Sequence, residues 1–213
     1  MRMRNKPWAI PFLESFKDTV VNEPHLVASN WKSRLNCGIL HVEIGSGKGD
    51  YWNKMAHMYP DHGWIAIEKD RNVAASSLKK NRDEILPTMA LINLDAKDIG
   101  KWFADGEVDV LHLNFSDPWP KKGHIKRRLS HSEFLKEYKR LLSAGGEIQM
   151  KTDNGGLFEF SCVEMSNNGF ICKELSVDYR RMDHPEDVIT EYEQRFLDLN
   201  QPIYRAVWRK NNE

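Results

Sequence analysis

The residues best suited to chemistry lie in one run, 114–122, which reads Asn-Phe-Ser-Asp-Pro-Trp-Pro-Lys-Lys. Asp117 supplies a carboxylate and Trp119 a flat aromatic face, while the two prolines fix the backbone and remove amide donors, so that no strand continues through them. A basic stretch over 121–128 follows directly, and no acidic residue stands between Asp117 and Glu133. In nucleic-acid sites, cations bind the phosphates and a neighbouring aromatic ring stacks on the bases. The run therefore predicts a nucleic-acid site that contains a reactive carboxylate.

Short apolar strands alternate with amphipathic helices along the chain, which is typical of βαβ units. Strands are expected at 39–44, 63–68, 88–93, 108–114, 147–152, 171–177 and 203–209. Helices are expected at 50–59, 72–84 and 157–166. A further helix is expected to begin with a capping box of Ser130 and Glu133 and to end at Gly145 and Gly146. Its buried stripe would consist of Phe134, Leu135, Tyr138, Leu141 and Leu142.

The ends of the first three expected strands carry a second set of candidate residues. Gly45 and Gly47 follow the first strand, where a glycine backbone can approach a ligand closely. Glu68 ends the second strand, where it would bind ribose hydroxyls, and Asp95 follows the third, within reach of an adenine amine. The glycine spacing is not the dinucleotide fingerprint. Glu43 would repel a pyrophosphate but attract an ammonium and a sulfonium, so charge favours S-adenosylmethionine over NAD as the cofactor.

Each candidate also has an ordinary structural interpretation. Strand-end acids are often solvated loop residues, and charge runs are often solvated faces. Trp119 could be a core aromatic residue, Asp153 could cap the next helix, and Thr190 with Glu193 fits a capping box. His112 is expected to be a core residue with satisfied hydrogen bonds, and the histidines show no metal-binding spacing, so no metal is expected. Three acids in register nevertheless favour a functional site.

Composition sets mild bounds on the class of protein. The chain has 213 residues, 40% of them hydrophobic, which predicts one domain over 1–213 with a basic arm and a helix at 24–35. Lys plus Arg and Asp plus Glu both number 31, so nucleic-acid binding would need a local patch. The three cysteines are expected to be reduced core thiols of a cytoplasmic protein. Neither a secretory signal nor a membrane span is expected.

Three motifs carry a resemblance to a known family. They are DPWPKK at 117–122 with KRR at 126–128, KTDN at 151–154, and TEYEQRF at 190–196. In this order, and over nearly the whole chain from about residue 25, they resemble the bacterial tRNA (guanine-N7-)-methyltransferase family. The resemblance implies a class I S-adenosylmethionine-dependent methyltransferase fold: an α/β, Rossmann-like, mostly parallel seven-stranded sheet with helices on both faces. It also implies methyl transfer to N7 of a guanosine in the tRNA variable loop.

The resemblance also implies a role for each matching residue. The cofactor contacts would be Glu43, Gly45, Gly47, Glu68, Asp95 and Asp117, with Asp117 also the catalytic residue. The substrate nucleoside would be held by Lys121, Asp153, Thr190, Glu191, Tyr192 and Glu193. The RNA would be contacted by Gly123, His124, Ile125, Lys126, Arg127 and Arg128. Gly123 and Gly155 stand where many members of the family carry a basic residue.

The chemistry of this reaction agrees with the residues available. Guanine N7 carries an in-plane lone pair and no proton, so its methylation needs no general base. Asp117 could steady positive charge as it moves from the sulfonium to the ring, and the remaining task is alignment. Two alternatives stay open, an NAD-linked oxidoreductase on a similar sheet and a noncatalytic RNA-binding module. The expected partner is tRNA, with no membrane, and the protein is expected to be a monomer or a homodimer.

Overall fold

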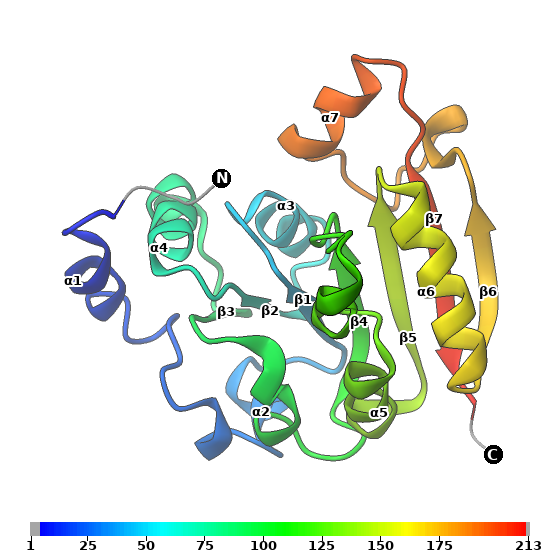
Figure 1. Ribbon diagram of the computed structural model, residues 1–213. Helices are drawn as coiled ribbons and strands as arrows, with labels where there is room; N and C mark the ends of the chain where they lie inside the picture. Colours follow the sequence, from blue (N-terminus) through cyan, green and yellow to red (C-terminus); the bar gives the residue numbers. More distant parts are fainter. Residues whose placement is uncertain (1–4, 212–213) are drawn as a thin grey trace.

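The computed structural model describes residues 5–211, and its centre is a seven-stranded sheet in the order β3-β2-β1-β4-β5-β7-β6 (Figure 1). The strands are β1 Leu40–Ile44, β2 Gly63–Ile67, β3 Met89–Ile92, β4 Val108–Asn114, β5 Leu142–Thr152, β6 Phe170–Ser176 and β7 Tyr204–Lys210. Strands β1 to β5 pair in parallel, whereas β7 runs antiparallel to both β5 and β6. All seven expected strands are confirmed, and so is the mostly parallel sheet.

The helices are α1 Ala9–Glu14, α2 Trp31–Arg34, α3 Asp50–Met58, α4 Arg71–Lys80, α5 Ser132–Leu141, α6 Gly155–Asn167 and α7 Glu191–Leu197. Helices α1 and α2 precede β1, and the other helices lie in the connections between the strands. Short 3₁₀ helices lie at Pro24–Leu26, Arg82–Glu84, Ala96–Lys101, Lys122–Arg127 and Tyr179–Arg181. The three expected helices at 50–59, 72–84 and 157–166 are thus present, with ends shifted by a few residues.

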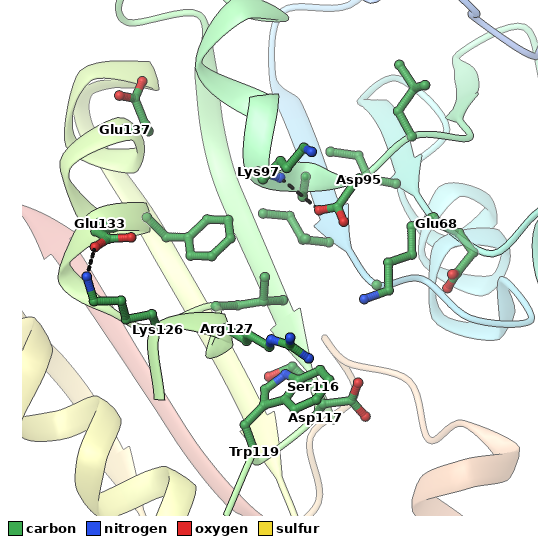
Figure 2. A pocket seen from close by; sticks show the side chains of 18 of the residues that line it. Glu68, Asp95, Lys97, Ser116, Asp117, Trp119, Lys126, Arg127, Glu133 and Glu137 are labelled. Atoms are coloured by element: carbon green, nitrogen blue, oxygen red, sulfur yellow. Dashed lines mark hydrogen bonds and ion pairs between the residues drawn. The ribbon is translucent and has the colours of Figure 1, made fainter. Parts of the chain in front are cut away.

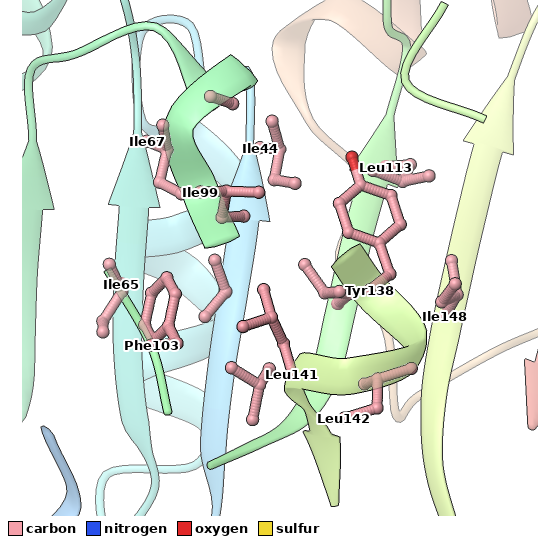
Figure 3. Packing of buried hydrophobic residues seen from close by; sticks show 14 of the residues in the cluster. Ile44, Ile65, Ile67, Ile99, Phe103, Leu113, Tyr138, Leu141, Leu142 and Ile148 are labelled. Carbon is pink, nitrogen blue, oxygen red and sulfur yellow. The ribbon is translucent and has the colours of Figure 1, made fainter. Parts of the chain in front are cut away.

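Two apolar cores lie on opposite faces of the sheet because successive strand residues point to opposite sides. On β2, Ile65 and Ile67 join a cluster with residues of α2, α5 and α6. Trp64 and Ala66 join a second cluster with residues of α1, α3 and α4. Figure 3 shows the first cluster, in which Tyr138 of α5 packs toward the sheet. Helices on both faces are therefore confirmed.

The expected capping box of Ser130 and Glu133 is wrong. The residue that caps α5 is His131, whose ring nitrogen accepts a hydrogen bond from the Glu133 amide at 3.3 Å. Ser130 is buried instead, and its hydroxyl lies 2.7 Å from the Ser161 hydroxyl of α6. A buried hydroxyl needs a partner, and this contact ties α5 to α6.

The expected end of this helix is also wrong. Helix α5 ends at Leu141, and β5 begins at Leu142 and runs through Gly145 and Gly146. Of the expected stripe, Leu135, Tyr138 and Leu141 are buried within the helix, Leu142 is buried in the strand, and Phe134 is half-buried. Glycines therefore lie within a long strand here and do not mark the stop of a helix.

The expected helix at 24–35 is divided into two short pieces. A 3₁₀ helix at Pro24–Leu26 precedes α2, and Ser29 between them has a φ of 72°. The described part of the basic arm, expected to be irregular, contains α1, whose Ala9 and Leu13 are buried in the second core. The rest of the arm, residues 1–4, lies outside the described residues.

Smaller expectations have mixed outcomes. His112 is a satisfied core residue as expected, because its ring nitrogens lie 3.0 Å from His41 Nδ1 and 3.3 Å from the Tyr51 hydroxyl. The cysteines are free as expected, but Cys172 is exposed and so is not a core residue. Within residues 5–211, no helix is long and apolar enough to cross a membrane.

Candidate active site

A cleft of about 650 Å³ opens at the carboxyl ends of β1 to β4 (Figure 2). Its lining includes Gly45, Glu68, Asp95, Asp117 and Trp119, which come from four different strand ends or the loops after them. The carboxyl edge of an open parallel sheet is where α/β proteins bind their ligands. The structure therefore brings together the strand-end acids and Asp117 that the sequence singled out.

The glycine turn after β1 adopts the left-handed backbone that favours glycine. Gly45 and Gly47 have φ values of 79° and 57°. A Cβ atom on Gly45 would meet nothing within 4 Å, so this residue presents open backbone to the clefts that it lines. Gly49 serves packing, since a Cβ there would lie 2.1 Å from the Ser77 hydroxyl of α4. The turn thus combines a ligand-facing part with a part that seats α3 against α4.

Glu68 and Asp95 both lie in the first cleft but in different environments. The Glu68 carboxylate accepts hydrogen bonds from the backbone amides of Gly47 at 3.0 Å and Asp70 at 2.8 Å. Burial raises the pKa of Glu68 despite these two donors. Asp95 is exposed and accepts a bond from the Lys97 amide at 3.1 Å. Glu68 is therefore held against the glycine turn, whereas Asp95 faces open solvent.

A second cleft of about 320 Å³ adjoins the first, because Gly45 and Phe115 line both. Glu43 lies in its lining and is only 3% exposed. One carboxylate oxygen of Glu43 accepts a hydrogen bond from Asn114 at 3.2 Å, and the other is buried without a partner. Burial raises the pKa of Glu43 to about 7. A buried carboxylate oxygen with no donor is a place where a cationic ligand group would be stabilised.

The segment that carries Asp117 has a constrained backbone. Phe115 and Trp119 have positive φ values of 49° and 40°, which are uncommon for bulky residues and cluster at functional sites. The Phe115 amide donates to the Lys151 carbonyl at 2.8 Å. Arg128 donates to the carbonyls of Pro118 at 2.9 Å and Trp119 at 3.3 Å. The surrounding hydrogen bonds thus hold the exposed Asp117 carboxylate over the first cleft.

The basic side chains of this region have different surroundings. Lys126 pairs with Glu133 at 3.0 Å, and the Arg127 guanidinium lies 5.0 Å from the centre of the Trp119 ring (Figure 2). Arg128 stacks over Phe160 at 4.4 Å while it holds the turn. Lys121 and Lys126 are exposed. Trp119 is half-buried and lines the cleft, so it is not a core aromatic residue.

The residues predicted to hold the nucleoside are spread over two places. Thr190, Glu191 and Tyr192 line the second cleft opposite the glycine turn. Burial raises the pKa of the Tyr192 phenol, with added contributions from the nearby carboxylates of Asp153 and Asp117. Tyr192 also packs on Phe115, with ring centres 5.1 Å apart. Tyr192 therefore lies near Phe115, which lines both clefts, and within electrostatic reach of Asp117 and Asp153.

Three of the residues predicted to hold the nucleoside lie outside the linings of these clefts: Lys121, Asp153 and Glu193. Glu193 is completely buried, and its amide donates to the Thr190 hydroxyl at 3.1 Å. The helix-capping half of the expected Thr190 and Glu193 box is thus confirmed. Asp153 does not cap α6, because Asn154 accepts the bond from the Leu157 amide.

Several cleft residues carried no assignment in the sequence. Asn114 and Phe115 stand in the run that ends β4, and their place just before Asp117 was the available signal. Tyr51 and Arg195 line the second cleft from α3 and α7. Arg195 belongs to the TEYEQRF motif, which was the available signal, whereas no pattern in the sequence points to Tyr51. Within residues 5–211, no group of three or more His, Cys, Asp or Glu side chains is placed to hold a metal ion.

Comparisons with known proteins agree with this geometry. A family model described as "Putative methyltransferase" matches residues 38–206. The tRNA (guanine-N(7)-)-methyltransferase of Oceanobacillus iheyensis is 43% identical over 207 residues, covering 97% of this chain and 97% of that protein. A protein of the same name from Geobacillus thermodenitrificans is also 43% identical, over 97% of this chain and 96% of its own.

Solved structures establish the fold. An antibiotic related methyltransferase superposes with a TM-score of 0.62 at 14% identity, covering 85% of this chain and 92% of its own. The 16S rRNA methyltransferase KamB gives 0.61 at 14% identity, over 86% and 92%. The fold is thus the Rossmann-like fold of class I methyltransferases, and neither the oxidoreductase nor the noncatalytic alternative finds support. The chain belongs to the tRNA (guanine-N7-)-methyltransferase family.

Proposed function

We propose that this protein transfers a methyl group from S-adenosylmethionine to N7 of a guanosine in the tRNA variable loop. The observation that carries the proposal is the junction of the two clefts at Gly45 and Phe115. The strand-end acids, the glycine turn and Asp117 line these two adjoining clefts. The two relatives are tRNA (guanine-N(7)-)-methyltransferases, which supplies the nucleic acid and the atom that is methylated.

The residues present fit S-adenosylmethionine. The open backbone at Gly45 leaves room for close approach, and the unpartnered oxygen of Glu43 offers a place for a cationic group. Glu68 would hold the ribose hydroxyls, Asp95 the adenine amine, and Glu43 the positively charged end of the molecule. When bound, the cofactor supplies a methyl group activated by a sulfonium. The protein supplies binding, orientation and a fixed negative charge.

The target base would enter where Asp117, Tyr192 and Phe115 meet. Tyr192 is 46% exposed and offers a ring face to a base drawn out of the tRNA. The Asp117 carboxylate would stabilise the positive charge that the guanine ring gains, because a preorganised charge acts where charge develops. Cations of the 121–128 segment would contact the phosphates around the base. No side chain is required to remove a proton from N7.

A direct test of this function is methyl incorporation. The protein would be incubated with tRNA and S-adenosylmethionine labelled in the methyl group, and label in the tRNA would be counted. Calorimetry with S-adenosylhomocysteine and with NAD would run in parallel. We expect label in the tRNA, and we expect the protein to bind S-adenosylhomocysteine but not NAD. Binding of NAD with no label in tRNA would contradict the proposal.

Glu68→Ala should weaken cofactor binding by about 1.5–3 kcal/mol, the size of charge-assisted hydrogen bonds to a ligand. The fold should survive, because Glu68 stands at a strand end and supports no apolar core. Calorimetric titration with S-adenosylhomocysteine measures the change. Glu147→Ala serves as the control, since Glu147 is an acid of β5 that pairs with Arg209 and lines neither cleft. Unchanged affinity in folded Glu68→Ala would remove the assignment.

Cofactor binding should release protons near pH 7. In the free protein burial raises the pKa of Glu43 to about 7, so the carboxyl is partly protonated there. A bound cation favours the carboxylate and lowers this pKa, so affinity should rise with pH between about 6 and 8 and then level off. Calorimetry in buffers of different ionisation enthalpy counts the released protons. Equal release by Glu43→Gln would show that another group is responsible.

Neutralising Lys126 and Arg127 together should reduce the salt dependence of tRNA binding. Each phosphate contact contributes roughly 0.7–0.9 to the slope of log affinity against log salt, so the double glutamine variant should lose about 1.4–1.8. Arg128 stays unchanged, because it holds the Asp117 turn. Lys101→Gln is a matched control for Lys126, since both side chains are 75% exposed and paired to one acid. An identical slope in the double variant would mean that these cations form only a solvated face.

A further inference from the structure

A buried cluster of four charges lies beneath the segment that carries Thr190 and Tyr192. The cluster consists of Lys151 of β5, Arg180, Asp187 and Glu193 of α7, and their side chains are 1%, 8%, 3% and 0% exposed. The last three belong to the long connection between β6 and β7. Figure 1 shows α7 above the carboxyl end of β5. Buried charges therefore anchor the connection to the sheet, in addition to apolar contacts such as that of Val188 with the second core.

Each cation of the cluster bridges both carboxylates. Lys151 Nζ lies 2.7 Å from Asp187 Oδ2 and 3.1 Å from Glu193 Oε2. Arg180 Nη2 lies 2.5 Å from Asp187 Oδ2, and Arg180 Nε lies 2.6 Å from Glu193 Oε1. Both cations also donate to the Val188 carbonyl at 3.2 Å. The two positive and two negative charges balance, and both oxygens of Glu193 are occupied.

Such a cluster is an expensive way to stabilise a fold. Charges removed from water lose their hydration, and apolar residues of similar volume often stabilise a protein as well or better. Hydrogen-bonded charges differ from apolar contacts in fixing distance and direction. Because Glu193 Oε1 and Oε2 each receive a different cation, rotation or displacement of Glu193 would break at least one of these contacts. The Thr190 hydroxyl, which accepts from the Glu193 amide at 3.1 Å, and Tyr192 are then fixed with it.

Lys151 connects this segment to the other wall of the site. Its carbonyl accepts the Phe115 amide at 2.8 Å, and so it holds the turn that leads to Asp117. Its ammonium lies 4.9 Å from the centre of the Tyr51 ring, and Tyr51 lines the second cleft. One residue therefore sets the backbone of Phe115 and, through its side chain, the segment that places Tyr192 on Phe115.

We propose that Lys151, Arg180, Asp187 and Glu193 form a positioning network that sets Thr190 and Tyr192 against Phe115 at the second cleft. Glu193 acts through this network and does not touch the nucleoside. The inference rests on the proposed function, in which the target nucleoside enters at this cleft. It adds three positioning residues, Lys151, Arg180 and Asp187, and changes the role of Glu193 from a contact to a support.

The test compares Arg180→Met and Arg180→Lys with Leu141→Ala. The lysine keeps the charge but lacks the planar fork that reaches both carboxylates. Leu141 is fully buried in the core of the other sheet face, so Leu141→Ala lowers stability without touching the network. All variants would be assayed well below their unfolding temperatures. The measurements are amide hydrogen exchange over 188–197, the KM for tRNA, kcat, and the affinity for S-adenosylhomocysteine.

In Arg180→Met we expect the Glu193 and Gln194 amides to exchange at least about tenfold faster while amides of β1 to β4 keep their rates. The KM for tRNA should rise by about tenfold or more, with S-adenosylhomocysteine affinity within about twofold of wild type. Arg180→Lys should lie between Arg180→Met and wild type. Leu141→Ala should leave the KM unchanged. If Arg180→Met does not fold, Arg180→Lys decides the question.

Wild-type exchange rates over 188–197 with an unchanged KM, in either folded Arg180 variant, would overturn the network. So would an equal rise of KM in Leu141→Ala, because general loss of stability would then suffice. The exchange experiment needs neither tRNA nor activity. A wild-type protein that fails to methylate tRNA would therefore count against the proposed function, whereas unchanged exchange in the variants would count against the network alone.

Discussion

Asp117→Asn is expected to lower turnover by about 30- to 1,000-fold, which corresponds to roughly 2–4 kcal/mol of activation barrier. The asparagine keeps the shape of the side chain and removes its charge, so the loss measures electrostatic stabilisation of the reacting groups. Affinity for tRNA should stay nearly unchanged. Single-turnover rates with saturating cofactor and tRNA measure the effect on the chemical step.

The same reasoning fixes the pH dependence of the reaction. N7 carries no proton, so the single-turnover rate at saturating cofactor should stay flat from neutral to mildly alkaline pH. Asp105→Asn is a suitable control, since Asp105 is an exposed acid paired with Arg140 that lines neither cleft. Full activity in Asp117→Asn would remove the assigned role. A steep alkaline rise, with chemistry as the slow step, would indicate a general base instead.

Lys151→Met is expected to lower the free energy of unfolding by about 3–5 kcal/mol, because it leaves buried carboxylates with one cation fewer. The Lys151 side chain is 1% exposed, and its partners Asp187 and Glu193 are 3% and 0% exposed. For a chain of this length the loss corresponds to a fall in Tm of about 6–20 °C. Urea unfolding and a thermal scan measure it.

Arg209→Met provides the comparison for this stability effect. Its ion pair with Glu147 lies at 3.0 Å like those of Lys151, but the Arg209 side chain is 45% exposed. Exposed pairs contribute about 0–1 kcal/mol, so this variant should unfold almost as the wild type does. If Lys151→Met costs no more than Arg209→Met, the buried cluster does not hold the segment in the way described.

The strands and the strand-end site could be predicted because their signals are local. Runs such as 39–44 and 63–68 are apolar and short, and a parallel sheet places their carboxyl ends at one edge. That placement alone brings Glu68, Asp95 and Asp117 into one cleft. The strand-end positions indicate the roles of Glu68 and Asp95, whereas the role of Asp117 comes from the family resemblance. All three roles stay predictions, and Glu68→Ala and Asp117→Asn test two of them.

The wrong expectations concern residues whose partners are distant in the sequence. Ser130 fits a capping box by spacing, but its hydroxyl pairs with Ser161, which lies 31 residues away. His131 caps α5 instead, and a local pattern contains no information about the distant partner of Ser130. The expected helix at 24–35 has no strong break in its sequence. Ser29 nevertheless adopts a left-handed backbone and divides the helix into two pieces.

The charge cluster could not be predicted for the same reason. Lys151 was recognised only as part of the KTDN motif, and a lysine at the end of a strand is ordinarily expected to reach solvent. Its partners Asp187 and Glu193 lie 36 and 42 residues further along the chain. Only the folded connection between β6 and β7 brings these charges together. No single residue in the sequence indicates that its charge is neutralised by the others.

We propose that the protein methylates N7 of guanosine in tRNA at the two adjoining clefts. Identifying the atom that receives the methyl group tests this proposal most directly. Purified protein, a tRNA transcript and S-adenosylmethionine would be incubated, and the digested RNA would be analysed by liquid chromatography and mass spectrometry. We expect 7-methylguanosine in the fragment that contains the variable loop, and none in a transcript whose guanosines there are replaced by adenosine. A methyl group on another atom or outside that fragment, or no methyl group at all, would contradict it.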